Sequence, residues 1–128
     1  MVSLDACYLI DLLHGDSAAA ELATRLETSG ELTCVTPPAS VEVLAGEMHV
    51  GGKYFEKARD LLASLHLLSF DNEAVETTSR LAARLMERGE RIGEGDLFIA
   101  GISLRHHQRL ITRDRVFARV PGLEVEFY

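Results

Sequence analysis

Four acidic residues from distant parts of the sequence are candidates for metal-ion chemistry. They are Asp5, Glu42, Asp96 and Asp114. Carboxylates that gather at one place repel one another unless cations lie among them. Hard divalent cations prefer oxygen ligands of this kind, and a bound cation lowers the pKa of a water molecule that it holds. If the four side chains meet in the fold, they predict hydrolysis that depends on one or two divalent cations.

Two of these acids follow predicted strands. Asp5 ends the short apolar strand expected at residues 1–4, and Asp114 comes after the strand expected at residues 109–112. Ligands of open α/β sheets bind beyond the carboxyl ends of the strands. Both acids are therefore expected at that edge of the sheet.

The other two acids reach the same edge from predicted helices. Thr36 stands before two prolines, which is a helix-start signal, and Glu42 lies about one turn into that helix. Asp96 begins the apolar helix expected at residues 97–104, which leads into the fourth strand. The four acids thus come from four separate segments and are expected at one place.

Each acid also has an ordinary structural explanation. Asp5 and Asp96 could serve only as helix N-caps, for which aspartate is well suited. Glu42 could simply face solvent, and Asp114 could occupy a turn. Only the four together point to a cation site, because mutual repulsion makes such a group unfavourable without one.

Residues near the acids have roles that the sequence leaves open. Glu94 could be an auxiliary ligand or a solvated loop residue. Thr112 could donate a hydrogen bond to a carboxylate or only fill a strand position. Arg113 and Arg115 flank Asp114 and could contact phosphate, with ordinary surface solvation as the alternative.

The chain as a whole alternates short strands with helical periods. Strands are expected at residues 1–4, 32–36, 66–70, 109–112 and 123–128. Between the first three strands we expect a helix at 8–13, a helix that stops at Gly30, one from Thr36 to about Gly46 and one through Phe55–Leu65. After the third strand we expect a long helix capped by Asp71, with Val75, Thr78, Ala82 and Leu85 on one face. A polar loop at 89–95 and the apolar helix at 97–104 follow. This alternation predicts an α/β fold over a single domain, residues 1–128, in which a central, mostly parallel sheet of four or five strands has helices on both faces.

The composition is typical of a globular protein of the cytoplasm. Apolar residues make up 47% and charged residues 26% of the 128 residues. No apolar run approaches the ~20 residues that a membrane helix needs, and the N-terminus lacks the features of a signal peptide. Cys7 and Cys34 are expected to be reduced thiols. We therefore expect a cytoplasmic protein without membrane contact.

The net charge of −7 argues at first against nucleic acid as a partner, because phosphate binders are usually basic. Residues 1–64 hold four basic and ten acidic residues, a balance of −6, whereas residues 65–128 hold nine and ten, a balance of −1. All nine basic residues of the second half are arginines. An acidic nuclease is physically reasonable when its carboxylates hold divalent cations, which reverse the local field.

The segments around the four acids resemble the motifs of the PIN-domain family. In chain order these segments are Leu4–Leu13, Ser40–Gly46, Gly95–Gly101, Leu110–Phe117 and Pro121–Val125. They are similar to a strand-end Asp before Leu-Ile-Asp-Leu-Leu, a helical Glu with a Gly four residues later, Asp-x-x-Ile-Ala, Thr-x-Asp-x-x-Phe and a closing Gly-Leu-x-Val strand. The ordered set spans the whole chain and looks most like the VapC toxins of that family.

The resemblance implies a metal-dependent endoribonuclease that cleaves RNA phosphodiester bonds and is the toxin of a type II toxin–antitoxin pair. It implies that the four acids are both metal ligands and catalytic residues, with Asp5 as the bridging ligand and Mg²⁺ as the ion, Mn²⁺ being a substitute. It also implies the strand order 3-2-1-4-5, a homodimer and a small cognate antitoxin. Part of the antitoxin groove is expected around Val43, Leu44, Phe55 and Leu62, with core packing as the alternative.

Two residues depart from the family pattern. Ala6 stands where Thr or Ser is usual, and Cys7 stands where Asn or another polar residue is usual. The lost hydroxyl leaves open a different function, that of a non-cleaving PIN-fold domain that binds RNA or protein. A phospho-acceptor receiver domain also has a strand-end Asp but needs a strand-end Lys, and the only lysines, Lys53 and Lys57, lie elsewhere.

Overall fold

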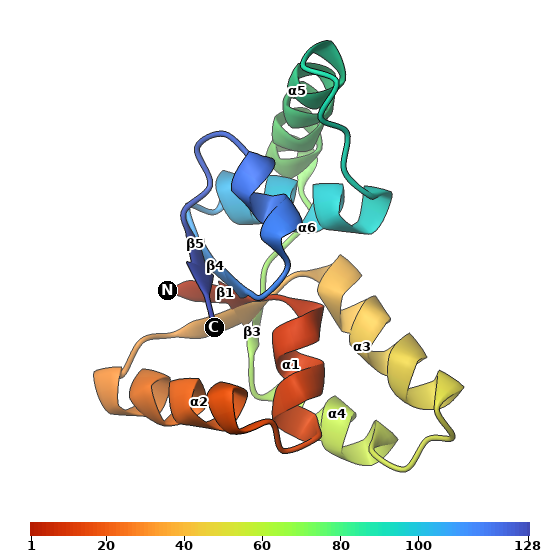
Figure 1. Ribbon diagram of the computed structural model, residues 1–128, viewed down its shortest axis with the longest axis vertical. Helices are drawn as coiled ribbons and strands as arrows, with labels where there is room; N and C mark the ends of the chain where they lie inside the picture. Colours follow the sequence, from red (N-terminus) through yellow and green to blue (C-terminus); the bar gives the residue numbers. More distant parts are fainter.

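A five-stranded sheet, parallel throughout, forms the centre of the protein (Figure 1). The computed structural model describes all residues from Met1 to Tyr128. The strands are β1 (Val2–Leu4), β2 (Thr33–Val35), β3 (His66–Leu67), β4 (Arg109–Thr112) and β5 (Val125–Phe127). Their order is β3-β2-β1-β4-β5, which confirms the predicted fold class and strand order.

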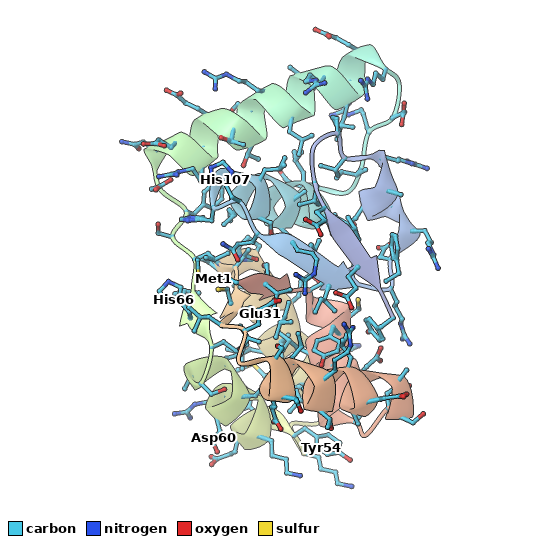
Figure 2. The ribbon with its side chains drawn as sticks, turned by 90° about the vertical axis from the view of Figure 1, so that its left-hand side faces the viewer. Met1, Glu31, Tyr54, Asp60, His66 and His107 are labelled. Carbon is cyan, nitrogen blue, oxygen red and sulfur yellow. The ribbon has the colours of Figure 1, made fainter.

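Helices cover both faces of this sheet. They are α1 (Ala6–Leu13), α2 (Ser17–Ser29), α3 (Pro37–His49), α4 (Phe55–Ala63), α5 (Asn72–Glu87), α6 (Glu94–Arg105) and the 3-10 helix η1 (Arg115–Arg119). Figure 1 and the perpendicular view of Figure 2 place α5 and α6 on one face and α2 and α4 on the other. None of the helices is both long and apolar enough to cross a membrane.

The central strands β1 and β4 are buried, and the hydrophobic core lies on both sides of them. Val2, Leu110 and Ile111 have no exposed surface, and Leu9 and Phe117 are also fully buried. Strands of a parallel sheet that are covered on both faces are expected to be apolar almost throughout. The short chain therefore places its two central strands where it can bury the most apolar surface.

Capping residues set the start of the helices. The Thr36 hydroxyl accepts a hydrogen bond from the amide of Ala39 at the start of α3, and a carboxylate oxygen of Asp71 accepts one from Ala74 at the start of α5. These side chains satisfy backbone amides that have no partner inside the helix. The predicted helix starts at Thr36 and Asp71 are therefore confirmed.

Several predicted boundaries are wrong by two residues or more, including those of α1, α4 and β5 and the three that follow. Helix α3 runs to His49 instead of ending near Gly46, because the chain turns only at Gly51 and Gly52, whose φ angles of 105° and 78° suit glycine. Helix α6 already begins at Glu94, inside the segment expected to be a loop. The third strand, expected at residues 66–70, has only two residues.

The predicted inner face of α5 is also partly wrong. Thr78 and Leu85 are buried as predicted, but Val75 is 49% exposed and Ala82 is half-buried. Ala74 and Leu81 are buried in their place. Alanines and valine stand next to each other on this helix, so that hydrophobic spacing alone does not distinguish two adjacent faces.

Candidate metal centre

The structure brings the four predicted acids to the carboxyl edge of the sheet, where β1 and β4 end. Asp5 directly follows β1, and Asp114 lies two residues beyond β4. Glu42 extends from α3 and Asp96 from the first turn of α6. We call Asp5, Glu42, Asp96 and Asp114 the four-acid group. Its members are close enough for the charge of one to raise the pKa of another.

Asp5 is the buried member of the group, with 4% of its surface exposed. Its Oδ1 accepts a hydrogen bond from the amide of Ala6 at 2.8 Å, so it also caps α1. Its Oδ2 accepts one from the Thr112 hydroxyl at 2.6 Å and one from Cys7 Sγ at 3.3 Å. Burial raises the pKa of Asp5 and the charge of Asp114 adds to the rise, although these hydrogen bonds oppose it. Asp5 is thus both a cap and a fixed carboxylate that faces other acids.

Asp96 is the third residue of α6. The N-cap of this helix is Gly93, and no side chain caps it. Capping therefore does not explain Asp96. Burial raises the pKa of Asp96 to about 6, and the charges of Asp5 and Asp114 contribute to the rise. This occurs although a helix N-terminus favours negative charge.

Glu42, on α3, lies within electrostatic range of Asp96, on α6. Partial burial raises its pKa, and the charges of Asp5 and Asp96 raise it further. Glu42 Oε1 lies against the backbone of Gly95, only 2.9 Å from where a β-carbon on that residue would stand. Gly95 therefore leaves room for the Glu42 carboxylate, a role that the sequence did not indicate.

Asp114 is exposed and has a structural role as well. Its Oδ1 accepts a hydrogen bond from the amide of Val116 at 3.0 Å and caps η1. Its own amide donates to the Thr112 hydroxyl at 3.0 Å. The turn role considered for Asp114 is present, and the same geometry places its carboxyl group within electrostatic range of Asp5 and Asp96.

The contacts of Thr112, Cys7 and Arg113 show what these residues near the four acids do. The Thr112 hydroxyl donates to Asp5, which confirms one of its two expected roles. Cys7 Sγ lies 3.3 Å from Asp5 Oδ2 and 3.4 Å from the Thr112 hydroxyl, so a thiol stands beside the carboxylate at one of the two positions that depart from the family pattern. Arg113 forms an ion pair with Asp11 at 3.0 Å, which leaves Arg115 as the unpaired neighbour of Asp114.

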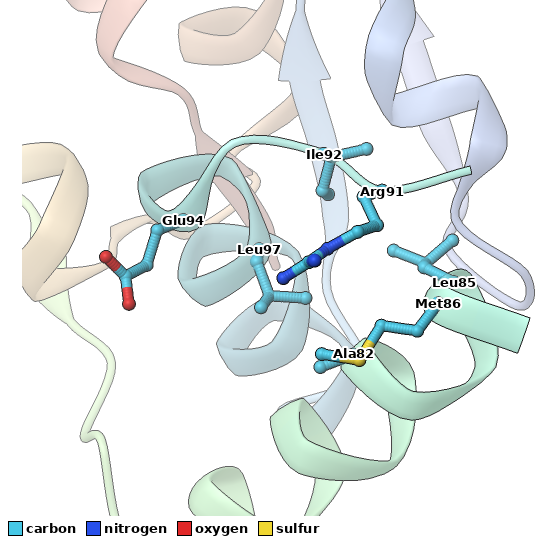
Figure 3. A pocket seen from close by; sticks show the side chains of 7 residues that line it. All are labelled: Ala82, Leu85, Met86, Arg91, Ile92, Glu94 and Leu97. Carbon is cyan, nitrogen blue, oxygen red and sulfur yellow. The ribbon is translucent and has the colours of Figure 1, made fainter. Parts of the chain in front are cut away.

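Glu94 differs from Asp5 and Asp96 in its exposure. It is exposed at the first position of α6 and borders a pocket of about 380 Å³ between α5 and α6 (Figure 3). In Figure 3 its carboxylate points away from Arg91 and Leu97, which line the same pocket. The exposure of Glu94 agrees with the solvated role considered for it.

The chemistry of the donor set fits a hard divalent cation. All four members are carboxylates, and none of them forms an ion pair with a lysine, arginine or histidine. Their negative charge is therefore uncompensated by the chain itself. In this arrangement no three acidic, histidine or cysteine side chains converge on a common point. A bound cation would have to draw the carboxylates inward.

Comparison with known proteins gives a family match and a set of similar folds. A family model for the PIN domain matches residues 2–123. Among curated proteins, none matches the sequence. The solved VapBC2 of Rickettsia felis, bound to a DNA fragment from its promoter, is 19% identical, with a TM-score of 0.88 over 100% of this chain and 99% of that chain.

Two further solved structures are similar over nearly the whole chain. The DNA-bound VapBC of Salmonella typhimurium is 22% identical, with a TM-score of 0.85 over 99% of this chain and 98% of that chain. VapBC-1 of nontypeable Haemophilus influenzae is 21% identical, with a TM-score of 0.79 over the same two shares. At these identities the likeness establishes the fold.

Proposed function

Since the chain belongs to the PIN-domain family, we propose that it is a metal-dependent endoribonuclease whose nuclease domain spans residues 1–128 and which cleaves RNA in the cytoplasm. The observation that supports this most directly is the four-acid group. Four carboxylates from four segments lie beyond the ends of β1 and β4, each within electrostatic range of at least two others, and none of them forms an ion pair with a basic side chain. Such a group is favourable when it holds cations.

The four acids would hold Mg²⁺, with Mn²⁺ as a substitute. When bound, the cation supplies a water molecule of lowered pKa and a positive charge for the leaving oxygen of the phosphodiester. The chain contributes the orientation of its carboxylates. Thr112 and Cys7 hold Oδ2 of Asp5, and the Ala6 amide holds Oδ1, so this carboxylate cannot rotate freely. Asp96 and Glu42 must lose their protons to act as ligands, and their raised pKa values make this step depend on pH.

Substitution of the four acids tests the proposal. Each amide variant, such as Asp5→Asn, keeps the size of the side chain and removes its charge. We expect each to lose at least about a hundredfold of the rate of RNA cleavage, with Asp114→Asn the mildest because Asp114 is exposed. Asp16→Asn is the matched control, since Asp16 caps α2, is not a member of the four-acid group, and asparagine also caps well. Full cleavage by all four variants would contradict the proposal.

We further propose that the protein is a VapC-like toxin that forms a homodimer and binds a small antitoxin. Support comes from the solved VapBC complexes that share its fold and from an apolar surface pocket of about 520 Å³ between α3, α4 and β3. Leu44 and Leu62 line this pocket, whereas Val43 is fully buried in the core. An antitoxin arginine could reach the four-acid group and form charge-assisted hydrogen bonds with it.

Co-purification tests the partner. The chain is expressed with the product of the neighbouring reading frame, and the mass of the complex is measured by light scattering after size-exclusion chromatography. We expect a stable complex and, for the chain alone, a dimer. A chain that stays monomeric and does not bind this product would contradict the toxin assignment. It would not contradict the nuclease proposal.

The alternative function, a non-cleaving PIN-fold domain, predicts a different outcome of the same assays. Such a domain would bind RNA or protein with or without divalent cations and would release no RNA fragments. Cleavage by the parent chain in Mg²⁺ would exclude it.

A further inference from the structure

Arg115 and Phe127 form a stacked pair beside the four-acid group. The Arg115 guanidinium carbon lies 4.1 Å from the centre of the Phe127 ring. Arg115 begins η1 directly after Asp114, and Phe127 ends β5. Arg115 is exposed and Phe127 is half-buried. The pair is therefore accessible from solvent at the edge of the sheet.

Strand register places Phe127 across β4 from Asp5. Thr112 of β4 is the register partner of Phe127 on β5, and the Thr112 hydroxyl donates to Asp5 on the other side. Asp5, Thr112 and Phe127 thus stand on three neighbouring chain segments. Adjacent strands are ~4.8 Å apart, so the backbones of Asp5 and Phe127 are separated by about 10 Å. A short single-stranded segment of nucleic acid could span that distance.

Arg115 directly follows Asp114 in the chain and has no acidic partner. Arg113, on the other side of Asp114 in the chain, is instead paired with Asp11. No ion pair includes Arg115. A chain with a net charge of −7 and four acids at this edge repels phosphate. The unpaired Arg115 guanidinium would attract a phosphate group to this edge.

An open hollow adjoins the aromatic ring. It has a volume of about 590 Å³ and lies between α2 and the end of β5, with Leu22, Arg25, Phe127 and Tyr128 among its lining residues. Tyr128 is held in place by its hydroxyl, which donates to Asp11 at 2.5 Å, and by an edge-on contact with Tyr8. The hollow therefore has a firm aromatic wall that a planar base could contact.

We propose that Arg115 and Phe127 form a subsite for single-stranded RNA next to the four-acid group, in which Phe127 stacks on a base and Arg115 contacts a backbone phosphate. Unpaired bases commonly stack on aromatic rings and guanidinium planes, and such stacking tolerates different bases. The subsite would position the strand whose phosphodiester lies at the four acids. It deepens the proposed nuclease function and rests on it.

Equilibrium binding of a labelled single-stranded RNA tests the subsite. Binding is measured by fluorescence anisotropy in Mg²⁺ on the Asp5→Asn background, so that the RNA stays intact. We expect Phe127→Leu to weaken binding about tenfold and Phe127→Tyr to keep it near that of the background protein. We expect Arg115→Gln to weaken binding and to lower the slope of log affinity against log salt by ~0.7, and Arg115→Lys to keep the slope.

Arg119→Gln is the matched control. Arg119 is on the same 3-10 helix, is also exposed and has no ion pair, and donates only to the carbonyl of Arg91. It should change neither affinity nor slope. If Phe127→Leu and Arg115→Gln bind RNA as tightly as the Arg119→Gln control, or lose only thermal stability or antitoxin binding, the subsite is wrong.

Failure of the subsite and failure of the nuclease proposal give different results. A parent chain that cleaves RNA, with variants that bind RNA normally, overturns the subsite alone. A parent chain that binds RNA through Phe127 and Arg115 but never cleaves it overturns the nuclease proposal alone. Absence of both RNA cleavage by the parent chain and RNA binding overturns both.

Discussion

Asp5 serves both the fold and the candidate metal centre. One carboxylate oxygen caps α1, and the other accepts hydrogen bonds from Thr112 and Cys7. Asparagine can keep the shape but not the charge, which is buried and lies near other acids. We therefore expect Asp5→Asn to lose cleavage while the free energy of unfolding of the metal-free protein rises by about 1 kcal/mol. Thermal melting in chelator measures this, and a lower melting temperature with intact cleavage would contradict it.

The raised pKa of Asp96 predicts a pH dependence with a definite sign. The folded-state value of about 6 lies above the unfolded value near 3.8, so the folded protein binds this proton more tightly. Its contribution to stability is complete below about 3.8 and is lost as the pH rises through about 6. The melting temperature in chelator should fall across this window, more in the parent than in Asp96→Asn. Equal pH profiles for the two proteins would contradict the expectation.

Substitution of Gly95 is expected to change RNA cleavage and stability in different directions. An added β-carbon would stand 2.9 Å from Glu42 Oε1, so Gly95→Ala must displace the end of that side chain. Alanine favours the helix by up to ~1 kcal/mol relative to glycine. We expect Gly95→Ala to be as stable as the parent or more stable, yet to cleave RNA about tenfold more slowly or worse. Unchanged cleavage would show that the position of Glu42 is not critical.

At this scale the sequence predicted the acids and one role of Thr112 but not the role of Gly95. The chemistry of a carboxylate or hydroxyl side chain follows from its residue type. The places of these residues at strand ends could be inferred from hydrophobic patterns. A glycine carries no such signal. Its closeness to Glu42 depends on how α3 and α6 pack, which only the structure shows.

At the scale of elements, β4 was predicted with its observed bounds, whereas helix ends and helix faces were less predictable. The 3-10 helix η1 was not expected, because its five residues are too few for a periodic pattern and Asp114 looks like a turn residue. The start of α6 at Glu94 was missed because two glycines stand beside that residue. The strand order came from family resemblance, since strands of this length carry no pairing information of their own.

Close packing of α5 against α6 yields a prediction about stability. A β-carbon on Gly101 would stand 2.0 Å from the Thr78 hydroxyl oxygen and 2.9 Å from the Thr78 Cα. Rotation of the side chain cannot relieve the contact with the backbone, so the helices must move apart. We expect Gly101→Ala to lower the free energy of unfolding by about 1–3 kcal/mol in denaturant titration.

Gly46→Ala is the matched control for this overpacking. Gly46 is also helical, and its β-carbon would meet only the Ile10 Cδ1 atom at 3.8 Å, an ordinary contact. This variant should be as stable as the parent or up to ~1 kcal/mol more stable. If Gly101→Ala has the same free energy of unfolding as Gly46→Ala, α5 and α6 pack more loosely than these distances indicate.

For the whole molecule, folding and cation binding should be coupled. The four-acid group joins segments from residue 5 to residue 114, so the site exists only in the folded chain. A ligand that binds only the folded state stabilises it by about 2.7 kcal/mol at a hundred times its Kd. Saturating Mg²⁺ or Mn²⁺ should therefore raise the melting temperature of the parent by several degrees and that of Asp5→Asn much less. An equal rise in both proteins would indicate binding elsewhere.

The most direct test of the central claim is RNA cleavage by one preparation of the parent chain under three conditions. Labelled RNA is incubated with the protein in chelator, then after Mg²⁺ is restored in excess, and in parallel with Asp5→Asn in the same Mg²⁺. A four-acid metal centre predicts no fragments in chelator, fragments when Mg²⁺ returns, and none with Asp5→Asn. Cleavage that persists in chelator, or that survives in Asp5→Asn, would contradict it.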